Sequence, residues 1–154
     1  ILLLACEKDD ICTEADTPLL VLTFFDSESP AEPKSVTRLR VIGLGNSAVA
    51  DTFADRSNRD SIALPLRSDT GRTGFVFIFQ SENDSEGVET GNRDTLYFDY
   101  STREVFASRA CGFVVQYEDL QAVAREDDDT WIEEVEIIQA SVTTSESTHV
   151  SIYH

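Results

Sequence analysis

Leu19-Leu20-Val21-Leu22-Thr23-Phe24-Phe25 is a seven-residue run that follows Pro18 and ends at Asp26. It is too short for a buried helix and rich in residues that favour strands. Phe75-Val76-Phe77-Ile78-Phe79 has the same character. Both runs are therefore predicted to be central strands, the second with aromatic side chains on both faces of its sheet.

Shorter segments around these two runs alternate apolar and polar residues, as half-buried strands do. We expect Val135, Ile137, Val150 and Ile152 to face inward, and Pro65 to confine its strand to a sheet edge because proline cannot donate a ladder hydrogen bond. The further predicted strands are residues 38–41, 62–66, 96–100, 104–108, 113–117, 132–143 and 148–153, with a short hairpin connection at 101–103. Residues 51–60 are predicted to be a loop and residues 120–124 a helical turn.

Short strands separated by turn signals predict an all-β domain. The expected architecture is an antiparallel β-sandwich, immunoglobulin-like, or a partly open barrel. At 154 residues with 41% hydrophobic residues, the chain is long enough to bury one core.

The chain is strongly acidic, with 12 Lys and Arg against 29 Asp and Glu and a net charge of −17. Nucleic-acid binding depends on neutralising phosphates with Lys and Arg, so this charge argues against a nucleic-acid partner. It equally argues against a polybasic grip on anionic lipid. Solubility on an exposed surface is a sufficient reason for it.

The first ten residues combine an apolar run, a small residue, a cysteine and a charge cluster, in the order Ile1-Leu2-Leu3-Leu4-Ala5-Cys6-Glu7-Lys8-Asp9-Asp10. This order resembles the lipobox of bacterial lipoproteins, which implies cleavage before Cys6 and its acylation. Residues 1–5 would then be a signal-peptide remnant, 6–17 a lipidated tether and 18–154 the single folded domain. The alternative is a first strand that contains a cysteine. Because each buried CH₂ contributes about 0.8 kcal/mol, two or more acyl chains would hold the protein firmly.

Lys8, Asp9 and Asp10 resemble the short tag that sends lipoproteins of the Bacteroidota to the outer face of the outer membrane. The alternative is a solvated tether that keeps the domain away from lipid. The export prediction depends on the lipobox prediction.

Three cysteines are present, and acylation of Cys6 would leave Cys12 and Cys111 as an even pair. Disulfides persist in an exported compartment, so we expect these two residues to be bonded. The closed loop would be worth roughly 4–5 kcal/mol in the chain-entropy model. Two free, buried thiols are the alternative.

Several segments together resemble an uncharacterised family of small outer-membrane lipoproteins from marine and gliding Bacteroidota. They are the Cys-Glu-Lys-Asp-Asp-Ile-Cys opening at 6–12, Thr-Pro at 17–18 with the strand ending Phe-Phe-Asp at 24–26, Ala-Cys-Gly-Phe at 110–113, Trp-Ile-Glu at 131–133 and His-Val-Ser-Ile-Tyr at 149–153. The resemblance covers nearly all of residues 6–154. It implies an outer-membrane lipoprotein, with an outer-membrane β-barrel protein as its partner, and no established activity.

Two ligand motifs are rejected on their context. Gly43-Leu44-Gly45-Asn46-Ser47-Ala48 superficially fits a dinucleotide fingerprint, but the preceding strand carries two arginines and no βαβ unit follows, so a glycine-rich turn is predicted. Residues 82–93 mimic the start of an EF-hand loop, but its twelfth position is Arg93 rather than glutamate. No metal or other cofactor is predicted. Asp127, Asp128 and Asp129 are chemically suited to Ca²⁺, and a solvated acidic loop is favoured over that reading.

No catalytic constellation stands out either. His149 is predicted to point away from the core, opposite to Val150, and the chain has only one other histidine, His154. The chain also lacks a nucleophile elbow. Trp131, Tyr97 and Tyr153 are more simply packing residues than a sugar- or peptide-binding face.

The sequence therefore favours a non-enzymatic, lipid-anchored module for interactions at the cell surface. The alternative function is a surface hydrolase or glycan-processing accessory protein using paired carboxylates, which the 29 acids allow without singling out a pair.

Overall fold

The computed structural model describes residues 11–12 and 16–154. Regular structure in these residues is entirely β, and no described segment is a helix able to cross a membrane. The strands are β1 (Leu20–Phe25), β2 (Val36–Gly43), β3 (Ser57–Arg59), β4 (Ser61–Leu64), β5 (Arg72–Phe79), β6 (Asn92–Ser108), β7 (Gly112–Arg125), β8 (Glu134–Ile137) and β9 (Val150–Tyr153).

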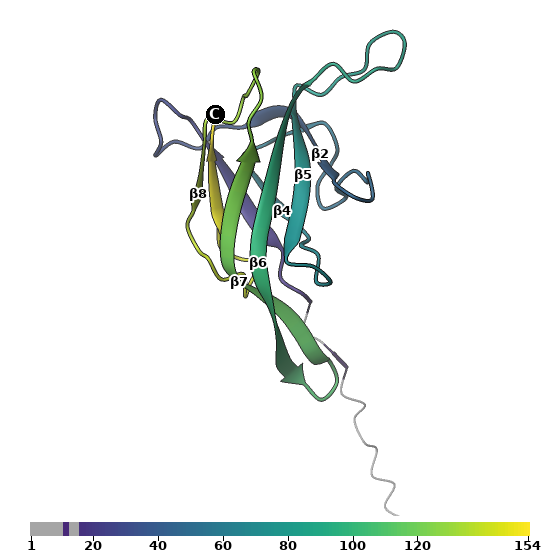
Figure 1. The fold of residues 1–154 in the computed structure, drawn as a ribbon, viewed down its shortest axis with the longest axis vertical. Coiled ribbons are helices and arrows are strands. Elements are labelled where there is room, and N and C mark those ends of the chain that lie inside the picture. Colours follow the sequence, from purple (N-terminus) through teal and green to yellow (C-terminus); the bar gives the residue numbers. More distant parts are fainter. Residues whose placement is uncertain (1–10, 13–15) are drawn as a thin grey trace, which may run out of the picture.

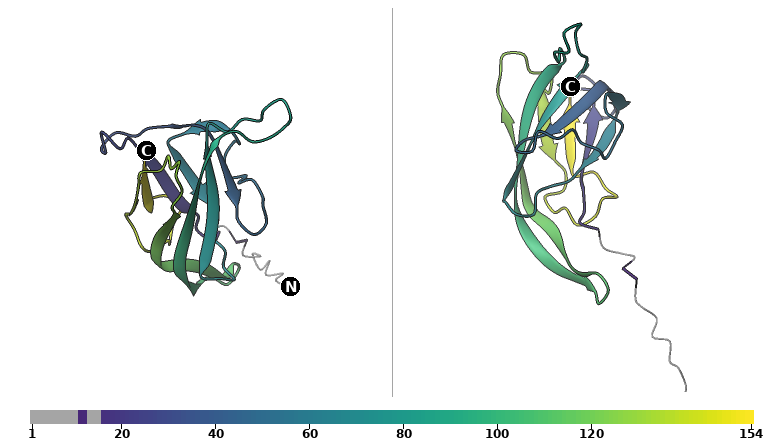
Figure 2. Two further views of the ribbon diagram at one scale, coloured as in Figure 1. Left: turned by 45° about the horizontal axis from the view of Figure 1, so that its top comes forward. Right: turned by 90° about the vertical axis from the view of Figure 1, so that its right-hand side faces the viewer.

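The strands form two sheets that pack face to face (Figures 1 and 2). One sheet has four strands in the order β4-β1-β9-β8, and the other has five in the order β3-β2-β5-β6-β7. Neither closes into a barrel within the described chain, so the predicted β-sandwich is confirmed. The four-stranded sheet is mixed rather than wholly antiparallel, because the last strand β9 enters beside β1 in the same direction.

The core lies between the sheets and supports the central position predicted for β1 and β5. Leu22 and Phe24 of β1 and Phe77 of β5 are fully buried. The prediction of aromatic side chains on both faces of β5 was wrong. Phe75, Phe77 and Phe79 share one face because alternate residues of a strand point the same way.

Two local predictions about the longest hairpin were also wrong. Residues 101–103 are not a turn but lie within β6, and residues 120–124 lie within β7 rather than in a helical turn. The real turn is at residues 109–111. The polar residues 101–103 resembled a turn. They lie in a strand here because this part of the hairpin is exposed to solvent, where polar side chains need not be desolvated.

Other element boundaries were predicted in part. β4 is an edge strand that ends just before Pro65, as expected. β3 lies within the predicted loop 51–60, and the predicted strand 132–143 contains only β8. Val150 and Ile152 face the core as predicted, and Val135 and Ile137 also pack against it, although they are only partly buried at the edge of their sheet.

The β6–β7 hairpin extends well past the sandwich (Figures 1 and 2). We call its projecting part, residues 101–116, the hairpin arm. Beyond buried Tyr100 and Tyr117, most arm side chains are exposed or only partly buried. At about 3.4 Å per residue, the eight residues from Ser101 to Ser108 project roughly 27 Å.

Candidate functional site

The base of the hairpin arm is held by two tyrosines that face each other across β6 and β7. Their rings meet edge to face, with centroids 5.0 Å apart. The Tyr100 hydroxyl donates to the carbonyl of Arg67 at 2.6 Å, and the Tyr117 hydroxyl donates to that of Leu66 at 2.9 Å. These contacts tie both arm strands to the segment after β4, so the arm leaves the sandwich at a defined position.

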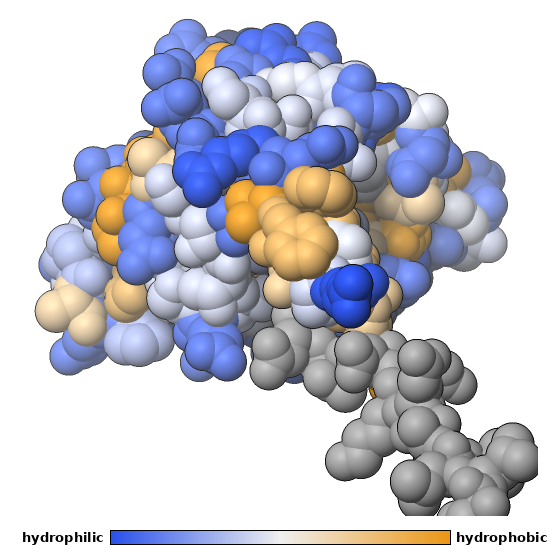
Figure 3. Space-filling model, turned by 90° about the horizontal axis from the view of Figure 1, so that it is seen from below, coloured by the Kyte–Doolittle hydropathy of each residue, from blue (hydrophilic) through white to orange (hydrophobic). Residues whose placement is uncertain are grey.

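The face of the hairpin that lines the core continues along the arm. The pairing register shifts after Asp99, opposite Asp119 of β7, which has a positive φ. Because of this shift, the core-facing side chains of both strands stay on the same face along the arm. Phe106 and Phe113 pair across the strands on this face, with ring centroids 5.6 Å apart. The described part of the chain leaves the pair uncovered, and the two residues are 59% and 67% exposed. Figure 3, seen from the arm's end of the molecule, shows apolar surface gathered there.

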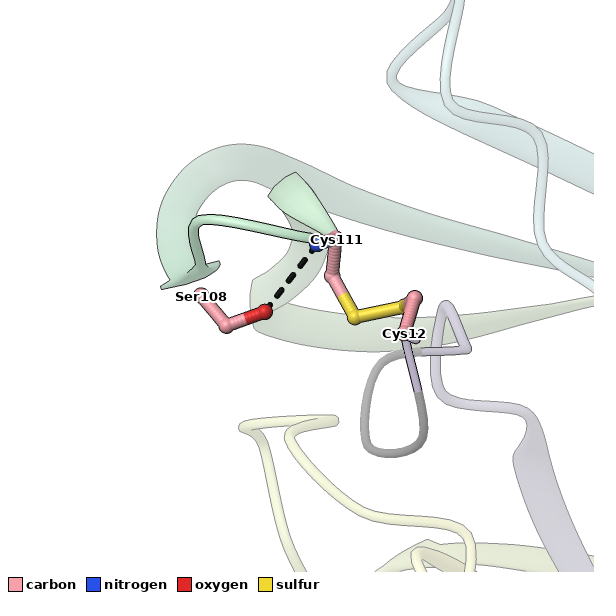
Figure 4. Close-up of a disulfide and its surroundings, with 3 residues drawn as sticks. All are labelled: Cys12, Ser108 and Cys111. Atoms are coloured by element: carbon pink, nitrogen blue, oxygen red, sulfur yellow. Dashed lines mark hydrogen bonds between the residues drawn. A yellow bond between two sulfur atoms is a disulfide. The ribbon is translucent and has the colours of Figure 1, made fainter. Parts of the chain in front are cut away.

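The turn of the arm carries the disulfide predicted from the cysteine count. Cys12 and Cys111 are bonded, with Cα atoms 4.9 Å apart (Figure 4). The backbone N–H of Cys111 donates to the Ser108 hydroxyl at 3.0 Å, which closes the turn. The disulfide therefore joins the N-terminal segment to the tip of the arm.

The other N-terminal predictions lie outside the described residues. They concern the lipidation residue Cys6 and the export residues Lys8, Asp9 and Asp10. Their positions along the chain still place them within a few residues of the bonded Cys12.

His149 is buried rather than exposed, which corrects the prediction from the sequence. It precedes β9, so strand alternation does not govern its direction, and its Nδ1 accepts the backbone N–H of Val21 at 3.0 Å. Burial lowers its pKa, partly opposed by the backbone of Thr144, and Nε2 has no hydrogen-bond partner among the described residues. The ring is therefore held neutral as a structural link between β1 and the segment before β9.

A partly buried carboxylate that sequence reasoning missed organises the loop between β5 and β6. Glu89 accepts hydrogen bonds from the Ser81 hydroxyl at 2.7 Å and from the backbone N–H groups of Glu82 and Gly91 at 2.9 and 3.0 Å. Arg56 lies 3.2 Å from it. Burial alone would raise the Glu89 pKa, but these donors outweigh it and lower the pKa to about 2. Both oxygens of Glu89 are therefore occupied by donors from the protein itself, and the cluster has the structural role of holding the β5–β6 loop.

Asp94 has the opposite environment. One carboxylate oxygen accepts the backbone N–H groups of Trp131 and Ile132 at 2.9 and 2.7 Å, while the other is buried without a partner in the described chain. Burial raises its pKa, and nearby Asp127 and Asp129 raise it further. Among the described carboxylic acids with a resolved shift, Asp94 alone has a raised pKa.

Two surface pockets lie away from the arm. The larger, about 600 Å³, is lined by the Gly43–Ala48 turn, with Arg67 and Gly74. Gly45 has a φ of 99°, and the Asn46 side-chain oxygen accepts the backbone N–H of Ala48, so the predicted glycine-rich turn is confirmed. The smaller, about 400 Å³, is lined by Tyr153 and several glutamates.

The acidic loops do not gather ligands for a cation. The part of the chain that the structure describes contains no group of three or more His, Cys, Asp or Glu side chains able to hold a metal ion. Asp127 accepts the backbone N–H of Asp129, and Asp84 accepts those of Glu86 and Val88. These carboxylates therefore serve the turns in which they lie.

The three aromatic residues considered as a binding face have separate neighbours. Trp131 packs on Phe79 and on the His154 ring, both at 5.6 Å. Tyr97 lies under Arg72, and Tyr153 packs on Phe25. Each has a packing role where it lies.

The exposed Phe106 and Phe113 pair was missed because the sequence prediction divided β6 into two strands. A signal was present, since residues 105–117 contain one arginine and no acid in a chain of 29 acids. The hairpin arm, with its disulfide and apolar tip, is the candidate functional site.

Comparisons with known proteins locate the chain in one family. No curated protein and no solved structure matches it. Residues 38–154, which run from within β2 through β9 and include the whole hairpin arm, match a family of unknown function. The chain belongs to that family, DUF6452.

Proposed function

We propose that this protein is a lipid-anchored, non-enzymatic interaction module of the bacterial outer membrane, exposed at the cell surface. The observation that carries the proposal is the chain opening, Leu2-Leu3-Leu4-Ala5-Cys6 followed by charged residues. The bond between Cys12 and Cys111 agrees with it, because disulfides persist in the oxidising compartment to which lipoproteins are exported.

The lack of an enzymatic role is part of the proposal, and the two histidines support it. His149 is buried with Nδ1 occupied, and the His154 ring packs against Trp131. Neither is presented to a nucleophile as a general base must be. The interaction partner is an envelope component, and the resemblance of the sequence suggests an outer-membrane β-barrel protein.

Mass spectrometry of the protein purified from native envelopes tests the anchor. We expect the mature N-terminus at Cys6 with acyl groups on its sulfur and amino group. The variant Cys6→Ser should lack this modification and lose membrane association, while Cys12→Ser keeps both. An unmodified peptide that runs continuously through Cys6 in the native protein would refute the anchor. Crosslinking in intact cells, followed by identification of the captured protein, tests the partner.

A further inference from the structure

We infer that the tip of the hairpin arm is a membrane-docking surface, with Phe106 and Phe113 entering the lipid interface next to the acyl anchor. The inference rests on the proposed function, which supplies the anchor, and adds a second contact made by the folded domain itself. Three observations carry it: the covalent reach of the anchor, the composition of the tip and the shape of the molecule.

The disulfide limits the distance between the anchor and the tip. Six residue steps separate Cys6 from Cys12, and a fully extended chain spans at most about 3.6 Å per residue, so the anchor lies within roughly 22 Å of the disulfide. Cys12 is bonded to Cys111 in the turn of the arm. An acylated Cys6 would therefore hold the tip of the arm close to the lipid.

The tip has the chemistry of an interfacial segment. Phe106 and Phe113 are both largely exposed, and no strand of the opposite sheet covers them. The turn between them adds Arg109, a partner for lipid phosphate, and no acid. Aromatic rings at the depth of lipid headgroups, with a cation nearby, are the usual composition of peripheral membrane contacts.

The next acid limits the depth of entry. Glu104 lies on the same face as Phe106, two residues closer to the sandwich. Two residues of a strand span about 7 Å, which matches the roughly 5–10 Å to which interfacial segments enter. The arm would thus stop where its first carboxylate reaches the surface.

The arm also separates an acidic body from the membrane. The chain has a net charge of −17, and anionic headgroups repel it. Screening in physiological salt extends over about 8 Å, and the arm projects roughly 27 Å. The apolar tip can therefore touch lipid while the acidic sandwich remains outside the range of repulsion.

Tryptophan fluorescence in vesicles tests the contact. The lipidated full-length protein is reconstituted into phosphatidylcholine vesicles with brominated acyl chains, which quench tryptophans that enter the lipid. The test variant is Phe106→Trp, with Phe113→Trp as a second in case the first misfolds. The matched control is Val88→Trp, because Val88 is also largely exposed but lies on the β5–β6 loop at the opposite end of the molecule (Figure 1). The unmodified protein, with Trp131 alone, provides the baseline.

We expect brominated lipid to reduce the fluorescence added by the Phe106→Trp substitution at least twofold and to leave unchanged the fluorescence added by Val88→Trp. Equal fluorescence of the Phe106→Trp variant in brominated and ordinary vesicles, from protein that floats with the vesicles, would overturn the inference and leave the anchor intact. Equal quenching of both variants would also overturn it, because the body would then lie on the lipid.

Two further outcomes have separate meanings. A blue-shifted emission of the Phe106→Trp variant without lipid, together with a doubled molecular mass, would overturn the inference and assign the tip to a second copy of the chain. Native protein without an acyl group would remove the proposed function itself, which the mass spectrum decides separately.

Discussion

Two carboxylates, Glu89 partly buried and Asp94 buried, show how neighbouring hydrogen-bond donors decide whether the charged form is favoured. Glu89 has donors for both of its oxygens, and its pKa falls to about 2. Asp94 has two donors on one oxygen and, among the described residues, none on the other, and burial raises its pKa. The ionised carboxylate of Glu89 therefore stabilises the folded state, whereas the ionised form of Asp94 is disfavoured by its burial.

Substitutions of Asp94 should separate its hydrogen bonds from its charge. Asp94→Asn keeps an oxygen for the N–H groups of Trp131 and Ile132 and removes the buried charge, but it places the amide NH₂ where the second oxygen has no partner among the described residues, so it should lose less stability than Asp94→Ala. Asp94→Ala leaves both N–H groups without a partner and should cost about 2–4 kcal/mol. Urea unfolding measures both variants. Equal loss in the two would show that the charge itself is what stabilises this position.

The pH dependence of stability should reveal Glu89. Its folded pKa of about 2 lies below its ordinary value of 4.5, so its contribution is present above pH 4.5 and is lost as the pH falls towards 2. Glu89→Gln should reduce the free energy of unfolding at neutral pH by about 2–3 kcal/mol, and the gap should close over that window. Glu86→Gln, at an exposed position on the same loop, is the control for urea titrations at each pH. A gap that stays constant with pH would contradict the assignment.

Among the elements, the hairpin arm shows why a disulfide can matter more locally than globally. The bond attaches to the turn of the arm, which the opposite sheet does not cover. It therefore restricts the arm in the folded state as well as the unfolded chain. Its net effect on the free energy of unfolding should be smaller than the chain-entropy value.

Removing the disulfide should loosen the arm and leave the sandwich folded. For Cys12→Ser combined with Cys111→Ser, we expect a loss well below the roughly 4–5 kcal/mol of the chain-entropy model. Trypsin should cleave faster after Arg109 in the turn. Limited proteolysis with mass analysis and thermal unfolding measure the two effects. If cleavage after Arg109 proceeded at the same rate as unfolding of the whole domain, the arm would not loosen independently of the sandwich.

The division of β6 explains how the arm was missed. Residues 101–103 are polar, and a strand that is wet on both faces has no apolar alternation to identify it. The buried strands β1 and β5 were identified because their environment requires apolar residues. The candidate site was predicted in part for the same reason. The Cys12–Cys111 bond was expected from the sequence, but the position of Cys111 at the end of a projecting arm was not.

At the scale of the whole molecule, net charge acts against compactness. The charge of −17 is spread over one small domain, and like charges repel more strongly when they are held close. Surface ion pairs such as Arg103 with Glu118 contribute little in water. Repulsion should therefore outweigh attraction among the exposed charges.

Salt should stabilise the folded protein for that reason. Raising NaCl from low ionic strength to about 0.15 M shortens the screening length to about 8 Å, and the melting temperature should rise by several degrees. Sucrose at equal osmolality is the control for general exclusion effects. A melting temperature that falls with salt would mean that the ion pairs outweigh the net repulsion.

Four features could be predicted from the amino-acid sequence: the class of the fold, the central strands, the edge position of the strand that ends before Pro65 and the bond between Cys12 and Cys111. The strand period and the missing proline donor can be seen within the chain, and the cysteine pair follows once Cys6 is set aside as the residue expected to be acylated. Three features became visible only in the folded molecule: β9 lies parallel to β1, His149 is buried, and Phe106 and Phe113 are exposed at the end of an arm. These depend on which residues the opposite sheet covers, and burial is a property of the packed molecule rather than of any segment.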